Sequence, residues 1–250
     1  MAKKGAKSMK NKLILSVLSI LIIFSCFIGC TKDTPTQSLE TGTLENTPLP
    51  RLDLSNKKIG DYVTLGKYEQ DNNEANGAED IEWLIVDSQK GKMLVVSKYI
   101  LDSKKYNEEK GDTTWESCSL REWLNINFMD IAFNDAEKGY IGELLVRAEN
   151  NKTDNVSGGN NTLDYVFILS KGQIEQYFPT AEDRKCAPTE YALSQGASTG
   201  NNKSAGWWTR TPGISQSESY HIDQNGEPAS IETDASTNGI RPAMWIYIEY

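Results

Sequence analysis

Gly206-Trp207-Trp208-Thr209-Arg210-Thr211-Pro212-Gly213 is the stretch on which the fold depends, and Gly239-Ile240-Arg241-Pro242-Ala243-Met244-Trp245 follows it near the C-terminus. Each combines aromatic residues, an arginine and a proline, as a short strand that runs into a turn does. Two such segments so close in sequence predict neighbouring strands in the core. Trp207 and Trp208 would point to opposite faces of a strand, so at most one of them needs to be in the core.

The two arginines of these segments are expected to be structural. Arg210 and Arg241 lie beside prolines that fix turns, and a guanidinium group can stack on an aromatic ring while it donates to loop carbonyls. The other interpretation places Arg210 near one tryptophan, with Tyr220 or Trp115, in an aromatic platform that binds a ligand.

The N-terminal residues 1–29 have the features of a lipoprotein signal peptide. Five lysines precede an apolar run from Leu13 to Ile28, which is short for a membrane span. Phe27-Ile28-Gly29-Cys30 resembles a bacterial lipobox, so Cys30 is predicted to carry the lipid and to become the mature N-terminus. This predicts a lipid-anchored, extracytoplasmic protein of the cell envelope whose membrane contact is the lipid. The alternative is an uncleaved signal anchor with an incidental cysteine.

Composition divides the remainder into a tether and one domain. Residues 30–52 are rich in Thr, Pro, Ser and Glu and cannot bury enough apolar surface to fold, so they are predicted to form a flexible tether. Residues 53–250 show no second low-complexity break and no internal repeat, which favours a single α+β domain.

The charge excludes one class of partner. The chain has a formal net charge of -9, and loss of residues 1–29 would remove five lysines and no acid. Nucleic-acid binding requires a cationic surface, and no basic run or stripe is present. No nucleic-acid partner is therefore expected.

The clearest helix is predicted from Ser117 to Phe128, because apolar residues recur there at spacings of three and four. Asn134-x-x-Glu137 and Ser170-x-x-Gln173 have capping-box spacing and predict two further helices, the second ended by Pro179. Strands are predicted at residues 62–66, 81–86, 92–97, 164–169, 207–210, 219–223 and 243–248, with a turn at 223–226.

The order of these signals resembles an uncharacterised bacterial domain family that is common in surface-exposed and lipid-anchored proteins. The resemblance covers nearly all of residues 59–250. It is carried by Thr114-Trp115-Glu116-Ser117-Cys118-Ser119-Leu120-Arg121-Glu122-Trp123-Leu124-Asn125, by Cys186-x-Pro188-Thr189-x-Tyr191-Ala192, by Gly158-Gly159-Asn160 and by the two segments quoted first.

That family is similar, more distantly, to the C-type lectin-like fold of formylglycine-generating enzymes. The resemblance implies an α+β domain of mixed, mostly antiparallel sheets with two or three helices and long loops, the loops of its second half forming a binding face. It implies no reaction, because those enzymes use a pair of cysteines late in the chain and no cysteine follows Cys186 here. The Glu-Pro-Asn and Trp-Asn-Asp motifs of sugar-binding lectins are also absent from the sequence.

Four residues are candidates for ligand binding: Trp115, Trp208, Tyr220 and His221. The aromatic rings could form a platform that stacks on a sugar or peptide. His221 is the single histidine of the chain, so a histidine-rich metal cluster is excluded, and a catalytic triad would have to use His221. No Gly-x-Ser-x-Gly elbow marks a nucleophile for it.

Asp154, Asn160 and Asp164 surround Gly158-Gly159 and offer oxygen ligands of the kind that calcium prefers. Such loops also occur for turn geometry alone, and no other cofactor is expected.

The two cysteines beyond residue 30, Cys118 and Cys186, could form a disulfide in an exported chain or be two buried thiols.

The function expected from the sequence is non-enzymatic recognition of a glycan, peptide or protein by a lipid-anchored surface domain. The alternatives are a hydrolase or oxidase on the same fold and a structural module of the envelope.

Overall fold

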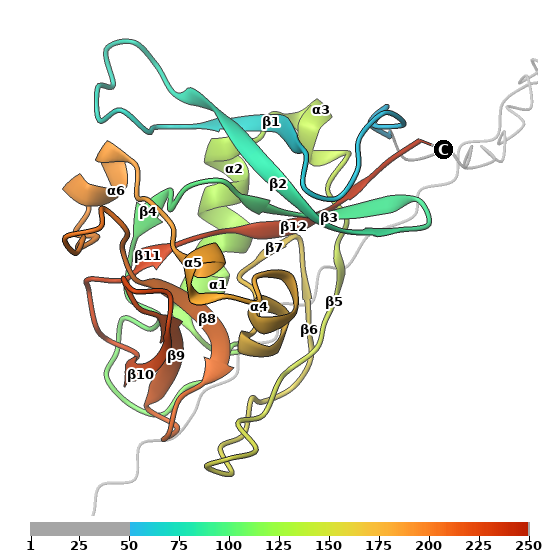
Figure 1. Ribbon diagram of the computed structural model, residues 1–250. Coiled ribbons are helices and arrows are strands. Elements are labelled where there is room, and N and C mark those ends of the chain that lie inside the picture. The colour runs from blue at the N-terminus through green and yellow to red at the C-terminus, as the bar shows by residue number, and fades with distance from the viewer. Residues whose placement is uncertain (1–50, 250) are drawn as a thin grey trace, which may run out of the picture. The chain divides into compact units, whose positions relative to one another are not determined.

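A computed structural model describes residues 51–249 of the protein (Figure 1). The predicted signal peptide, Cys30 and nearly all of the predicted tether lie outside the described residues. The described residues group into one compact unit. The class is mixed α+β, with mostly sheet and short helices. Within residues 51–249, no helix is both long and apolar enough to cross a membrane.

The first sheet has five strands in the order β1-β2-β3-β12-β7, and every neighbouring pair is antiparallel. Its strands are β1 (Tyr62–Tyr68), β2 (Glu79–Gln89), β3 (Lys92–Ser97), β12 (Ala243–Tyr247) and β7 (Val166–Phe167). The centre of the sheet is apolar on both faces, since Met93 to Val96 are all buried. The predicted strands of residues 62–66, 81–86, 92–97 and 243–248 are confirmed by these elements.

The second sheet has the order β10-β9-β8-β11-β4. Its strands are β4 (Asp102–Ser103), β8 (Trp207–Pro212), β9 (Glu218–Ile222), β10 (Pro228–Glu232) and β11 (Gly239–Ile240). The sequence predicted β8, β9 and the turn after β9, but not β10, to which that turn leads. A separate ribbon pairs β5 (Leu144–Val146) with β6 (Thr162–Asp164).

The two quoted segments meet as predicted in the second sheet, where β11 of the C-terminal segment lies beside β8. β11 pairs with β8 in parallel at Gly239 and Trp207, and the Gly239 N–H donates to the Gly206 carbonyl at 2.7 Å. The chain then passes through Arg241 and Pro242 into β12 of the first sheet. This C-terminal segment therefore joins the two sheets.

The predicted helix of residues 117–128 is observed as α1 (Ser119–Trp123), which continues into a π-helical turn (Leu124–Phe128) and α2 (Met129–Ala132). Its buried face carries Leu120, Leu124 and Phe128. Inside the π-helical turn, the Asn125 side chain donates to the Val166 carbonyl and accepts from the Tyr165 N–H, which ties the helix to β7.

Two predicted capping boxes are confirmed. Asn134 and Glu137 begin α3 (Asp135–Lys138), while Ser170 and Gln173 begin α4 (Lys171–Tyr177), which ends before Pro179. The number of helices was predicted too low. The short helices α5 (Ala181–Arg184) and α6 (Glu190–Ser194) lie where no helix was predicted.

The two ends of the described chain lie side by side. The Leu52 N–H donates to the Tyr247 carbonyl at 3.1 Å, and the Glu249 N–H donates to the Leu52 carbonyl at 2.9 Å. Leu52 was placed at the end of the tether and is instead part of the fold.

Candidate functional site

Both tryptophans proposed as ligand platforms are core residues. Trp208 is 0% exposed and its Nε1 donates to the Lys104 carbonyl at 2.9 Å; Trp115 is 2% exposed. Trp207 is also fully buried, because both faces of β8 are covered: Trp208 packs on Tyr106, and Trp207 packs on Arg241. The prediction that Trp115 and Trp208 face a ligand is therefore wrong for this structure.

The predicted calcium ligands are engaged in three separate contacts. The carboxylate of Asp164 is 0% exposed and accepts from Trp115 Nε1 at 2.8 Å, Thr162 Oγ1 at 2.6 Å and Arg121 Nε at 2.6 Å. Asp154 accepts from the Asn151 amide, and the Asn160 amide donates to Glu116. Each of the three side chains thus has a protein partner of its own, and calcium binding by them stays a prediction.

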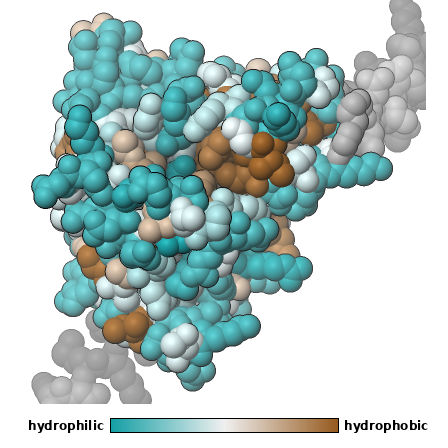
Figure 2. All heavy atoms as spheres, viewed as in Figure 1, coloured by the Kyte–Doolittle hydropathy of each residue, from teal (hydrophilic) through white to brown (hydrophobic). Residues whose placement is uncertain are grey.

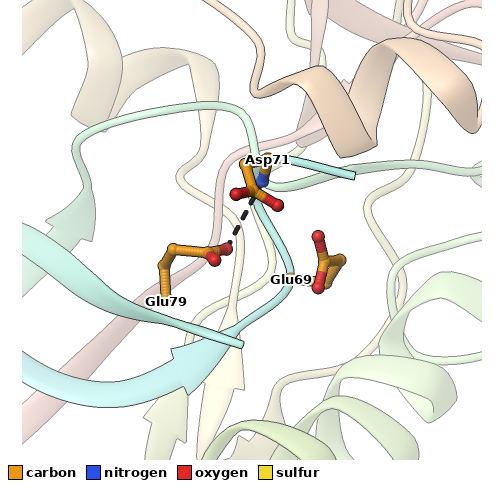
Figure 3. A group of neighbouring side chains, drawn as sticks. All are labelled: Glu69, Asp71 and Glu79. Atoms are coloured by element: carbon orange, nitrogen blue, oxygen red, sulfur yellow. Dashed lines mark hydrogen bonds between the residues drawn. The ribbon is translucent and has the colours of Figure 1, made fainter. Parts of the chain in front are cut away.

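A different acidic group lies in the loop between β1 and β2 (Figure 3). Carboxylate oxygens of Glu69, Asp71 and Glu79 lie within 4.8 Å of one another. Within residues 51–249, no other group of three or more Asp, Glu, His or Cys side chains has its ligand atoms this close together. Glu79 accepts from the Gln70 N–H, and Glu69 accepts from the Asn73 N–H. These contacts shape the exposed loop.

The two cysteines of the domain are separate buried thiols. Cys118 donates to the Trp115 carbonyl, and Cys186 donates to the Lys98 carbonyl. Burial raises the pKa of Cys118 to about 12 and also raises the pKa of Cys186. Of the two alternatives left open by the sequence, the structure shows the thiols.

Arg241 is buried in a stack of aromatic rings. Its guanidinium carbon lies 4.8 Å from the Phe178 ring centroid and 5.1 Å from that of Trp207, and its Nε donates to the Ser97 carbonyl. It thus stabilises the segment by which the chain passes from β11 of the second sheet to β12 of the first, which is the structural role expected from its position beside Pro242.

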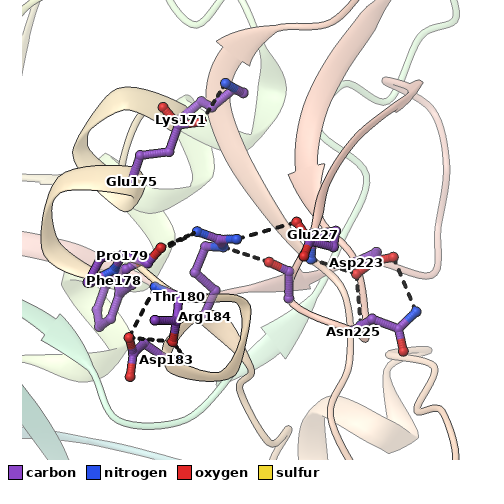
Figure 4. A network of polar contacts seen from close by, with 11 residues as sticks. Lys171, Glu175, Phe178, Pro179, Thr180, Asp183, Arg184, Asp223, Asn225 and Glu227 are labelled. Atoms are coloured by element: carbon purple, nitrogen blue, oxygen red, sulfur yellow. Dashed lines mark hydrogen bonds and ion pairs between the residues drawn. The ribbon is translucent and has the colours of Figure 1, made fainter.

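A third buried arginine, Arg184, was not predicted from the sequence to have a structural role. Arg184 lies at the end of α5, where Nε donates to the Gly226 carbonyl at 2.6 Å and Nη1 donates to the carbonyls of Phe178 and Pro179 (Figure 4). It ties the end of α4 to the β9–β10 turn. No local motif marks it, since its partners lie up to 43 residues away.

Arg210 is also stacked, over Phe167 at 5.6 Å, and is 6% exposed. Its Nη1 donates to the Ile168 carbonyl at 2.8 Å and to the Gln173 side chain at 2.6 Å. Nε is buried without a hydrogen-bond partner. Burial lowers the pKa of Arg210 to about 10, while the negative charge of Glu149 acts to raise it. Arg210 is therefore a buried cation without an ion-pair partner among the described carboxylates.

Arg210 lies in the wall of a hollow of about 560 Å³, here called the Trp245 hollow. The residues that line it also include Lys92, Arg147, Phe167, Gln173 and Trp245. Lys92 Nζ lies 4.7 Å from the Trp245 ring. Three cationic side chains face this space, and none of the described residues that line it is acidic.

An adjoining hollow of about 480 Å³, the Tyr220 hollow, is polar. Glu149, Asn150, Asn151, Lys152, Lys171 and Tyr220 line it. Lys171 Nζ lies 5.5 Å from the Tyr220 ring and also pairs with Glu175, as Figure 4 shows. Residues 144–147 line the Trp245 hollow and residues 148–153 line the Tyr220 hollow, so one segment contributes to both.

His221 lies in a smaller hollow of about 260 Å³ with Asn238. Its Nδ1 lies 2.8 Å from Asn238 Oδ1. Burial lowers the pKa of His221, while the Asn238 hydrogen bond and the charge of Asp223 oppose that change. No Ser or Thr hydroxyl of residues 51–249 hydrogen-bonds to the imidazole, so the structure assembles no triad around it.

The face shown in Figure 2 is mainly hydrophilic, and its hydrophobic residues form only small patches. A polar or amphipathic ligand suits this face better than a broad apolar one.

A family model described as "Domain of unknown function (DUF6273)" matches residues 90–248. No curated protein and no solved structure matches the chain. The matched range includes all residues of both hollows except Gln89, whereas β1 and β2 precede it.

Proposed function

This chain belongs to the DUF6273 family of domains of unknown function, and we propose that it is a non-enzymatic recognition domain. Its ligand is a glycan, a peptide or a protein, bound in the Trp245 and Tyr220 hollows. The domain is held at the outer face of a membrane by a lipid on Cys30.

The observation that supports this proposal is that one continuous segment of the chain lines both hollows. Residues 144–153 run past both, and each hollow has one half-buried aromatic ring, Trp245 in one and Tyr220 in the other. Half-buried aromatic rings beside amide and charged groups are typical of sites that bind polar ligands. Most of the lining residues come from the second half of the chain, while Gln89 and Lys92 come from β2 and β3.

The rival enzymatic function has less support. His221 is the histidine on which a triad would depend, and its recorded side-chain hydrogen bond is to Asn238 rather than to a hydroxyl group. A structural role in the envelope is the remaining alternative, and it requires no ligand in either hollow.

We infer the finer fold type, C-type lectin-like, from the resemblance of the sequence motifs. Mostly antiparallel sheets with long second-half loops support it. The lipid anchor is supported by the sequence alone. Labelling cells with a fatty-acid probe tests it: wild-type protein should incorporate the probe, and Cys30→Ser should not.

The recognition function can be tested with the full chain in detergent on a glycan array and in pulldowns with isolated cell walls. Tyr220→Ala and Trp245→Ala should each weaken a detected interaction about tenfold or more, the cost of losing an aromatic contact in an interface. Tyr165→Ala is the matched control, because this tyrosine is 36% exposed and lines neither hollow. Absence of binding in both assays would favour the structural module.

A further inference from the structure

We propose that the Trp245 hollow binds an oxyanion group, a carboxylate or a phosphate, on a ligand whose ring or apolar part lies against Trp245. This inference rests on the proposed recognition function, because it assigns a ligand class to one of the two hollows. It also makes a claim about Arg210 that can be tested before the natural ligand is known.

The first argument is the free edge of the Arg210 guanidinium. Nη1 is occupied by Ile168 and Gln173, whereas Nε and Nη2 have no hydrogen bond within the described chain. In a guanidinium group, Nε and Nη2 donate side by side along one edge, with the spacing of two oxygens of a carboxylate or phosphate. The contacts inside the protein thus leave without a partner the edge that suits a two-oxygen anion, although Nε itself is buried.

The second argument is the missing counter-charge. Two other buried or half-buried arginines have carboxylate partners: Arg121 pairs with Asp164 at 2.6 Å, and Arg184 pairs with Glu227 at 3.4 Å. Within residues 51–249 neither Arg210 nor Arg241 has such a partner, but of these two only Arg210 lines a hollow. A buried charged donor without a partner costs free energy, which a bound oxyanion would recover.

The third argument is the charge of the surroundings. Lys92 and Arg147 line the same space, and the Arg147 side chain makes no hydrogen bond or ion pair within residues 51–249. This concentration of positive charge occurs in a chain whose formal net charge is -9. A hollow lined by one sign of charge raises the local concentration of ligands of the opposite sign.

The shape of the hollow adds the second part of the ligand. Phe167 and Trp245 give it aromatic walls, and Leu144 and Val146 add aliphatic ones. A volume of about 560 Å³ is sufficient for a small organic anion and lies within the usual range for ligand pockets. An anion with a ring attached should therefore bind better than a bare one.

Arg241 provides an internal comparison. It is as buried as Arg210 and also stacked on aromatic rings, but its Nε donates to the Ser97 carbonyl and it lines neither hollow. A ligand in the Trp245 hollow should leave its Nε–H unaffected.

The experiment uses the full chain in detergent with ¹⁵N-labelled arginine. The chain has only six arginines, so each Nε–H signal can be assigned by single substitutions. Sodium benzoate, inorganic phosphate and neutral benzamide are titrated at constant ionic strength. We expect saturable shifts of the Arg210 and Arg147 signals with benzoate, weaker ones with phosphate and none with benzamide, while the Arg241 signal stays in place.

Two variants complete the test without disturbing the core. Arg147→Gln should weaken benzoate binding roughly three- to fivefold, the effect of one partly screened charge. Lys152→Gln removes a charge from the Tyr220 hollow and should leave the affinity within about twofold. If Arg210→Lys folds, it should lose the preference for benzoate over benzamide, because a lysine cannot present the two-donor edge.

An unmoved Arg210 signal with both anions, or equal shifts with benzoate and benzamide, would overturn the anion assignment. The recognition function would still stand if a glycan or wall ligand bound through Tyr220. Conversely, saturable benzoate binding without any glycan or wall ligand would support the anion site and count against the broader function.

Discussion

The indole Nε1 of Trp115 donates to Oδ2 of Asp164 at 2.8 Å, and both groups are buried. One residue was expected to face a ligand and the other to hold a metal ion. Their contact instead joins the segment before α1 to the end of β6, and Arg121 supplies the charge that compensates the carboxylate.

Asp164→Asn should destabilise the fold by about 3 kcal/mol, because it leaves Arg121 partly buried without its ion pair and replaces one of the two accepting oxygens by an NH2 group that cannot accept. For a domain of this size, the thermal midpoint should fall by roughly 6–12 °C. Asp154→Asn is the control, since Asp154 is exposed and accepts a single hydrogen bond from Asn151. Similar midpoints for both variants would contradict the structural importance of Asp164.

Gly226→Ala should destabilise the protein more than Gly77→Ala. Both glycines have positive φ, +86° and +82°, so alanine costs about 1 kcal/mol in either place. At Gly226 the added Cβ would also overlap the Ala181 carbonyl and disturb the Arg184 hydrogen bond, whereas nothing lies within 4 Å at Gly77. Urea unfolding of the two variants measures the difference, and equal losses would refute the close approach of α5 to the β9–β10 turn.

The thiols of Cys118 and Cys186 should be unreactive in the native protein, because both are buried and burial raises the pKa of each. In a chain that carries Cys26→Ser and Cys30→Ser, a thiol reagent should find no fast-reacting group before unfolding. It should find two after unfolding without reductant. Fewer than two, restored by reductant, would establish a disulfide instead.

Stability should decrease as the pH falls below about 6.5, with a contribution from His221. Burial lowers the folded-state pKa of this histidine below 6.5, so protons bind the unfolded chain more readily in that window. The stabilising effect of the neutral ring is complete above the unfolded pKa and is lost as the pH falls through the folded pKa.

Because the chain has one histidine, its proton NMR signal reports this pKa directly. His221→Gln should flatten the pH dependence of the urea midpoint between pH 7.5 and the folded pKa. A measured pKa at or above 6.5 would contradict the predicted direction.

Short sequence patterns were sufficient to predict the helices and turns whose formation depends on residues close together in the chain. The capping boxes at Asn134 and Ser170 predicted α3 and α4, since both partners of each box lie within one turn. The spacing of apolar residues predicted α1, and the residues at 223–226 predicted the turn after β9, because both signals are also local. β10 was not predicted, because Pro228–Glu232 is short and begins with a proline, and its strand form depends on pairing with β9.

The site depended on contacts that no local pattern encodes. A tryptophan on a strand can be core or surface, and for Trp208 the deciding neighbours are Lys104 and Tyr106, about a hundred residues earlier in the chain. Arg210 was expected to be stacked, but its free edge follows from the placement of Ile168 and Gln173 on its other side. Trp245, although part of a quoted motif, was not considered as a ligand contact.

The pairing of Leu52 with the last strand also bears on engineering the protein. Since residues 52 and 249 are hydrogen-bonded neighbours, a short linker could join them without spanning the domain. The domain could be circularly permuted, or inserted into a surface loop of a host protein as a cassette with adjacent entry and exit points. New ends opened at the exposed Asn76-Gly77 turn would lie away from both hollows, which would remain available for display.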